Sequence, residues 1–127
     1  MNKEELIKEI EESRLRLFDL KSKLNEINFE ERKQNALNHL GKCYKEVNNT
    51  FPEHFRYLYV YGISDEYQLL SISVSGYLDE NKYFSIEDYG NFNPDADNFV
   101  QVDKSIFETN YNLVKERIHN SINNISI

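Results

Sequence analysis

The first forty residues carry an apolar repeat of 3.5 residues, and this repeat constrains the segment more than any other feature of the chain. With Lys3 at heptad position a, the a and d positions from residue 6 to residue 27 are Leu6, Ile10, Ser13, Leu17, Leu20, Leu24 and Ile27. Only Ser13 is polar, so these side chains form a narrow stripe that pairs with another helix. No Gly or Pro occurs before residue 41, and helix propensity therefore agrees with the pattern. We predict a helical, coiled-coil segment over residues 1–40, with a second helical piece beyond Phe29 that ends before Gly41.

The partner of this stripe is either a second copy of the chain or the rest of the same chain. In a parallel dimer, Glu9 attracts Arg14 of the second copy, whereas Arg16 repels Lys21. Apolar residues outside the stripe (Ile7, Leu15 and Phe18) also allow the helix to dock on its own domain. The heptad run favours self-association, and we predict a homodimer or a higher even oligomer. Its expected interface residues are Leu6, Ile10, Leu17, Leu20, Leu24 and Ile27.

Residues 41–127 change to a period of two, which is typical of strands. Five short strands are expected at 42–47, 56–63, 70–75, 83–86 and 99–102, followed by a helix with Asp103 as its N-cap. The apolar face of that helix is expected to comprise Ile106, Phe107, Tyr111, Val114 and Ile118. The fold class is therefore α+β, with a five-stranded antiparallel sheet or a small SH3-like barrel between two helices.

Tyrosine is the most unusual component of this β-rich region. Strict alternation over residues 56–63 places Tyr57, Tyr59 and Tyr61 on one face, opposite Leu58, Val60 and Gly62, and other tyrosines can extend the row: Tyr67, Tyr77, Tyr83 and Tyr89. Amphipathic rings are enriched in interfaces. The alternative is that these rings cover a small core under the N-terminal helix. The next strand alternates apolar residues with Ser71, Ser73 and Ser75, which predicts one solvated face.

Negative charge is concentrated in the same region. The chain has a net charge of −7, and residues 56–103 carry only Arg56 and Lys82 against nine acidic residues. A surface of this sign repels phosphate, which disfavours direct DNA or RNA binding. An acidic surface can simply keep a protein soluble, but it also suits a partner with a basic surface. The candidate binding acids are Asp79, Glu80, Glu87, Asp88, Asp95 and Asp97.

The sequence gives little support for catalysis or for metal binding. The single Cys43 suits a reducing compartment and has no local sign of activation, and the three histidines are scattered. Asn93, Asp95 and Asp97 copy the first ligands of a calcium loop, but Asn98 and Lys104 stand where that loop needs Gly and Glu. We therefore expect a protein that is not an enzyme and that has neither a metal nor a cofactor.

The chain also lacks a run of apolar residues long enough for a membrane span and an apolar stretch of the kind found in secretory signals. A cytoplasmic protein without a membrane partner is expected.

Three short motifs suggest a setting: Gly41-Lys42-Cys43-Tyr44, the strand at 57–63, and the segment from Val100 to Glu108. In this layout the chain resembles small accessory proteins of phages and prophages of low-GC Gram-positive bacteria, which have an N-terminal coiled coil and a compact β domain. The resemblance implies a viral protein that binds a component of the host, and it carries over no catalytic residue.

Three functions follow as hypotheses. The first is an acidic, non-catalytic inhibitor of a bacterial defence protein, anti-CRISPR-like or otherwise anti-defence, that occupies a basic nucleic-acid-binding surface. The second is an oligomeric sponge for a nucleotide immune signal, in which tyrosines stack on the base and cations hold the phosphates: Arg56, Lys82, Lys115 and Arg117. The third is a structural or assembly role in the virion, which depends on the coiled coil alone.

Overall fold

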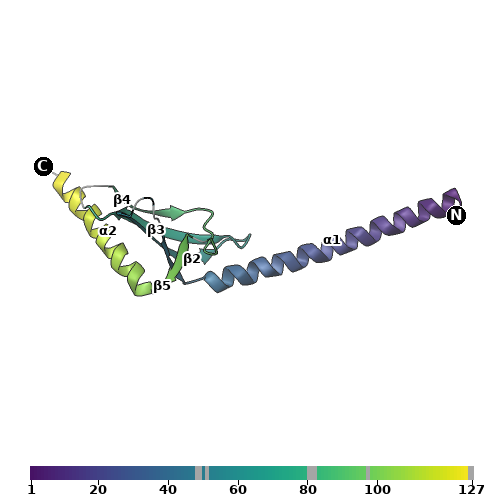
Figure 1. Ribbon diagram of the computed structural model, residues 1–127, viewed down its shortest axis with the longest axis horizontal. Coiled ribbons are helices and arrows are strands. Elements are labelled where there is room, and N and C mark those ends of the chain that lie inside the picture. Colours follow the sequence, from purple (N-terminus) through teal and green to yellow (C-terminus); the bar gives the residue numbers. More distant parts are fainter. Residues whose placement is uncertain (48–49, 51, 80–82, 97, 126–127) are drawn as a thin grey trace. The chain divides into compact units, whose positions relative to one another are not determined.

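The computed structural model describes residues 1–47, 50, 52–79, 83–96 and 98–125. Its elements follow in the order α1 (Lys3–His39), β1 (Cys43–Glu46), β2 (His54–Ile63), β3 (Leu69–Tyr77), β4 (Phe84–Tyr89), β5 (Phe99–Val102) and α2 (Lys104–Ile125) (Figure 1). The predicted α+β class is confirmed. The chain divides into two compact units, Met1–Asn35 and Ala36–Ile127, so the last turn of α1 belongs to the unit that contains the sheet.

Helix α1 is a single helix of 37 residues. It begins with a reciprocal cap, in which the Glu5 N–H donates to Asn2 Oδ1 (2.8 Å) and the Asn2 N–H donates to Glu5 Oε2 (3.4 Å). The prediction of a separate helical piece beyond Phe29 is wrong, because most of residues 30–39 are good helix formers and no Gly or Pro interrupts them. The chain leaves the helix through Gly41, whose φ of 80° is readily adopted by glycine.

The five strands form one antiparallel sheet in the order β4-β3-β2-β1-β5. Strands β1 to β4 are a meander, and β5 returns to pair with the free side of β1, so that Cys43 lies between Tyr59 and Val102. Among the described residues, β4 and β5 are the two edges, which makes the sheet open and selects the sheet over the barrel.

Helix α2 packs on one face of this sheet, which we call the helix-covered face. Its core joins Cys43, Phe55 and Val74 of the sheet to Phe107 and Val114 of the helix. The predicted apolar face of α2 is correct except for one residue, Ile106, which is 41% exposed. Consecutive side chains of a helix differ by about 100° in direction. Because Phe107 points at the sheet, Ile106 points away from it.

The opposite face has a second core, in which Phe92, from the segment between β4 and β5, packs with Tyr44, Leu58 and Val60. The rings of Phe92 and Tyr44 meet edge to face, with their centroids 5.3 Å apart.

The three serines of β3 lie on this second face. The prediction that they are solvated is wrong: Ser71, Ser73 and Ser75 are at most 2% exposed. The Ser71 hydroxyl donates to the Tyr89 carbonyl (3.0 Å), and the hydroxyls of Ser75 and Ser85 lie 3.0 Å apart. Neighbouring groups thus satisfy the hydroxyls of Ser71 and Ser75, whereas the buried hydroxyl of Ser73 has no hydrogen-bond partner in the described part of the chain.

Candidate functional site

The predicted tyrosine row of β2 lies on the helix-covered face, but the alternation of the strand ends at a bulge. Tyr57 and Tyr59 are partly buried on the helix-covered face and pack against its core, so they lie under α2. The register of β2 on β3 then shifts between Val60 and Gly62, and Gly62 pairs with Leu70. The strict alternation expected up to Gly62 is therefore wrong. Tyr61 falls at this bulge, which re-aims side chains, and it is 49% exposed.

The other tyrosines do not extend the row. Tyr89 lies on the opposite face, where its ring packs against Phe92 with centroids 5.9 Å apart. Tyr77 packs against His54, with ring centroids 5.1 Å apart, and Tyr67 adopts a φ of 59° in the turn before β3. Tyr83, which directly precedes β4, is 59% exposed. The aromatic surface on the helix-covered face is consequently shorter than predicted.

Tyr59 and Tyr61 instead help to line a pocket of about 490 Å³, which we call the tyrosine pocket. The sheet contributes Tyr59, Tyr61, Ile72 and Asp88, and the first turns of α2 contribute Lys104, Phe107, Glu108 and Tyr111. Its volume is within the range of ordinary ligand pockets. Strands β2, β3 and β4 and helix α2 therefore place four aromatic rings, two carboxylates and one ammonium group around one pocket.

Contacts within the tyrosine pocket fix most of its rings. The Tyr59 and Phe107 rings lie 5.6 Å apart, and Phe107 stacks on Tyr111 at 6.0 Å. The Tyr61 hydroxyl donates to Asp88 Oδ1 (3.3 Å). Desolvation and the charge of Asp88 both raise the pKa of Tyr61, so its hydroxyl stays protonated and remains a donor.

One cation already lies in the tyrosine pocket. The Lys104 ammonium is 5.2 Å from the centroid of the Tyr59 ring and 3.9 Å from Glu108 Oε1. Both charged side chains are 58% exposed, which makes the ion pair weak and allows the lysine to move. Sequence reasoning missed Lys104 and Glu108, although their spacing of four residues on a predicted helix indicates a shared face.

The predicted acids do not form one patch among the described residues. Asp88 lines the tyrosine pocket, but its neighbour Glu87 is opposite Ser73 and so faces the other side of the sheet. Asp79 lies just beyond the C-terminal end of β3. Ile72, the residue that pairs with Asp88, lies near the other end of that strand. Glu80 and Asp97 lie outside the described residues.

Asp95 takes part in a side-chain network on the second face. His39 bonds through Nδ1 to the Tyr44 hydroxyl, and its Nε2 lies 3.5 Å from Asp95 Oδ1. A carboxylate, an imidazole and a hydroxyl in this order resemble a nucleophile relay. Tyr44, however, is only 3% exposed, and burial together with Asp95 raises its pKa. The network therefore holds the end of α1 against β1 and does not offer a reactive oxygen.

Cys43 is buried, and desolvation raises the pKa of its thiol. The calcium-like segment forms a local turn, in which the Asp95 N–H donates to Asn93 Oδ1 (3.1 Å). Within the described part of the chain, no three His, Cys, Asp or Glu residues are grouped to hold a metal ion.

Two of the cations expected to hold a nucleotide are already engaged. Arg56 pairs with Glu46 at 3.2 Å, and its guanidinium lies 5.3 Å from the Tyr89 ring. Arg117 donates to the Tyr77 carbonyl (3.1 Å). Lys115 is exposed on α2, and Lys82 lies outside the described residues.

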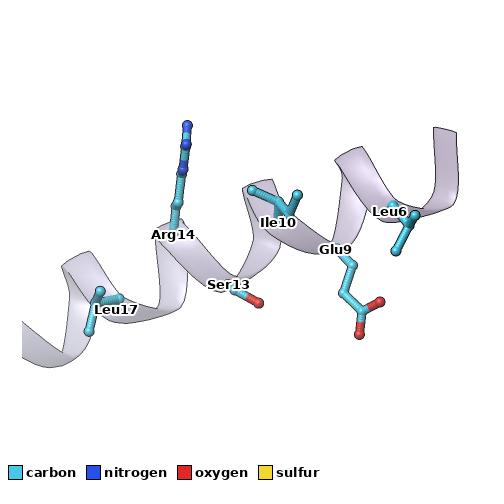
Figure 2. A pocket seen from close by; sticks show the side chains of 6 residues that line it. All are labelled: Leu6, Glu9, Ile10, Ser13, Arg14 and Leu17. Carbon is cyan, nitrogen blue, oxygen red and sulfur yellow. The ribbon is translucent and has the colours of Figure 1, made fainter. Parts of the chain in front are cut away.

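The heptad stripe of α1 is a second candidate interface. Its six apolar residues are each 48–56% exposed in the single chain. Figure 2 shows a shallow hollow along this stripe, with Leu6, Ile10 and Leu17 on the helix and with Glu9 and Arg14 extending to opposite sides. These two charged residues occupy the g and e positions that flank a coiled-coil seam.

Comparisons with known proteins add no relative: no family model, curated protein or solved structure matches this chain. In the described part of the chain, neither helix combines the length and the apolar character that crossing a membrane requires. The functional case therefore depends on the tyrosine pocket, the acidic charge and the heptad stripe.

Proposed function

We propose that this chain is a non-catalytic binding protein that captures a partner protein through a basic surface of that partner. Within this class, we propose a phage-type inhibitor that acts in the bacterial cytoplasm and blocks the nucleic-acid-binding surface of a defence protein. The observation that carries the proposal is the tyrosine pocket, a surface pocket whose lining combines aromatic side chains with the carboxylates of Asp88 and Glu108.

Aromatic side chains beside acidic groups suit this role for two physical reasons. Tyrosine supplies a large contact area with little loss of side-chain freedom, and aromatic residues are frequent among those that dominate binding energy. A net charge of −7 accelerates the encounter with a basic surface and repels competing nucleic acid. Acidic groups held on a sheet can thereby occupy a groove that normally receives phosphates.

The sponge hypothesis has less support. It needs free cations near a stacking surface, yet Arg56 and Arg117 are bonded within the protein. Among the described residues that line it, the tyrosine pocket has one cation, Lys104, and two carboxylates that would repel a phosphate.

We further propose that the chain self-associates through α1 as a homodimer or a higher even oligomer. Six half-exposed apolar residues at heptad spacing support this assembly, because a second copy of the helix covers them without any additional sequence. A virion assembly role remains compatible with the same stripe, and it predicts association with capsid or tail components instead of a defence protein.

The test of the inhibitor proposal is inhibition of purified basic defence nucleases, including a CRISPR effector, by a molar excess of the protein. Wild type is expected to inhibit one of them with an affinity that falls as salt rises. Asp79→Asn combined with Glu87→Gln tests the acidic charge separately from the tyrosine pocket, because it removes two exposed charges, one just after β3 and one in β4, that do not line the pocket. This variant should weaken inhibition by about 2- to 30-fold and flatten the salt dependence.

The matched control is Glu11→Gln combined with Glu12→Gln, which removes the same charge from α1 outside the heptad stripe. This control should inhibit like wild type. A wild type that leaves every nuclease of the panel active contradicts the proposal, and so does a control that weakens inhibition as much as the sheet variant.

A further inference from the structure

We infer that the tyrosine pocket is a cation-binding pocket that receives one arginine side chain of the partner protein. This inference deepens the proposed function and rests on the proposal that the partner is a basic protein. Its direct support is the composition of the lining: four aromatic rings and the carboxylates of Asp88 and Glu108 surround a space of about 490 Å³.

Aromatic rings attract cations because the face of each ring carries partial negative charge. The chain displays this attraction itself, since the Lys104 ammonium lies over the Tyr59 ring at 5.2 Å. Lys104 is 58% exposed and is paired only loosely with Glu108, at 3.9 Å. We therefore interpret Lys104 as an internal cation that a stronger external cation displaces.

Arginine fits the tyrosine pocket better than lysine does. A guanidinium is planar and less strongly hydrated than an ammonium, so it stacks on a tyrosine ring while its N–H groups reach carboxylates at the side. A carboxylate has about four acceptor positions, and the bond from the Tyr61 hydroxyl uses one of them on Asp88. Asp88 thus keeps acceptor capacity, while the Tyr61 bond orients it.

The charges that face the tyrosine pocket are those of Asp88, Glu108 and Lys104. With Lys104 in place their sum is −1, and when Lys104 moves away it is −2. Displacing the lysine therefore strengthens the field that holds an incoming guanidinium. Lys104 is accordingly expected to be an internal competitor, which weakens binding to the pocket and raises its selectivity.

The probe is a blocked tripeptide with a central arginine. It is added to the full chain, and binding is measured from the changes in the amide chemical shifts of the protein by NMR. Matched peptides carry lysine, or citrulline, which is a neutral isostere of arginine. We expect shifts centred on Tyr59, Tyr61 and residues 104–108, with affinity for the arginine peptide about tenfold above that for citrulline. Equal binding of the citrulline or lysine peptide overturns the inference.

Variants test the two roles separately. Lys104→Gln should tighten arginine binding several-fold, whereas Lys115→Gln, the same charge change at an exposed site on the same helix, should alter it little. Asp88→Asn combined with Glu108→Gln should abolish binding, and the Glu11→Gln/Glu12→Gln control should retain it. Tyr61→Leu removes a half-exposed ring outside the core and should also abolish binding. An unchanged affinity in either pocket variant overturns the inference.

The peptide result and the nuclease result are independent. If the arginine peptide binds but no nuclease is inhibited, the cation pocket stands and the inhibitor proposal fails. If wild type inhibits a nuclease and the Asp88→Asn/Glu108→Gln variant inhibits equally well, the inhibitor proposal stands and the pocket is not its contact.

Discussion

Aspartate at Leu17 and Leu24 is expected to dissociate the proposed dimer. Fully burying a Leu or Ile side chain contributes about 1.5–3 kcal/mol. Each of the six residues of the stripe is already about half buried in one chain, so pairing adds about 0.8–1.5 kcal/mol per residue. Two helices then gain about 9–18 kcal/mol, against an association cost of about 4–15 kcal/mol. Because the gain and the cost are of the same order, the dimer needs nearly all of its apolar positions.

The double substitution removes four of the twelve apolar side chains of the dimer. The loss is about 3–6 kcal/mol, which weakens association roughly 100- to 10,000-fold before the repulsion among the new charges is counted. Size-exclusion chromatography with light scattering at micromolar concentration gives the mass directly. Wild type should have the mass of two chains or a higher even number, and the variant the mass of one.

The control for this experiment places the same two aspartates at Leu15 and Phe18, outside the stripe. These residues are 70% and 73% exposed. Because the control also introduces two aspartates into α1, it has the same added charge and a similar cost in helix propensity. It should remain associated. A monomeric wild type refutes the assembly, and a control that dissociates as completely as the Leu17/Leu24 variant refutes the assignment of the seam.

Three further predictions concern the unit that contains the sheet, and urea unfolding measures each of them. Leu58 is fully buried, so Leu58→Ala should lower the free energy of unfolding by about 2–5 kcal/mol, whereas Leu78→Ala, at a site 69% exposed, should change it by less than about 0.5 kcal/mol. Equal effects would contradict the assigned core. Gly41→Ala forces a side chain onto a φ of 80° and should cost about 1 kcal/mol; no loss would show that the helix ends differently. Burial, with a contribution from Arg56, lowers the pKa of His54 below 6.5. The unfolded chain then binds the proton first, so stability should be greatest above that pH and decline as the pH falls below it, and His54→Gln should reduce the decline.

The strands were predictable wherever one side of the strand is apolar. The expected segment 99–102 coincides with β5, and 42–47 encloses β1. The expected segment 83–86 is too short, since β4 runs to Tyr89. Glu87 and Asp88 are both exposed at a sheet edge, where a strand needs no apolar alternation, and nothing in the local pattern indicates that the strand continues.

The candidate site was predictable in part for a similar reason. Tyr59, Tyr61 and Asp88 were expected to bind, and they meet in one pocket. Lys104 and Glu108 were not expected there, because two opposite charges four residues apart look like any exposed helix pair until α2 is packed on the sheet. The bulge after Val60 was also invisible, since a change of register depends on the partner strand.

The open edge at β4 has a consequence for how large an assembly of this protein can become. Edge strands invite pairing with another chain, and repeated edge pairing builds fibres. Glu87 and Asp88 are adjacent on β4 and face opposite sides of the sheet, so two copies paired along this strand would bring like charges together on both surfaces. Pairing through α1, in contrast, closes on itself in a two-fold dimer. We therefore expect a concentrated solution of the protein to contain finite particles that resist gelation.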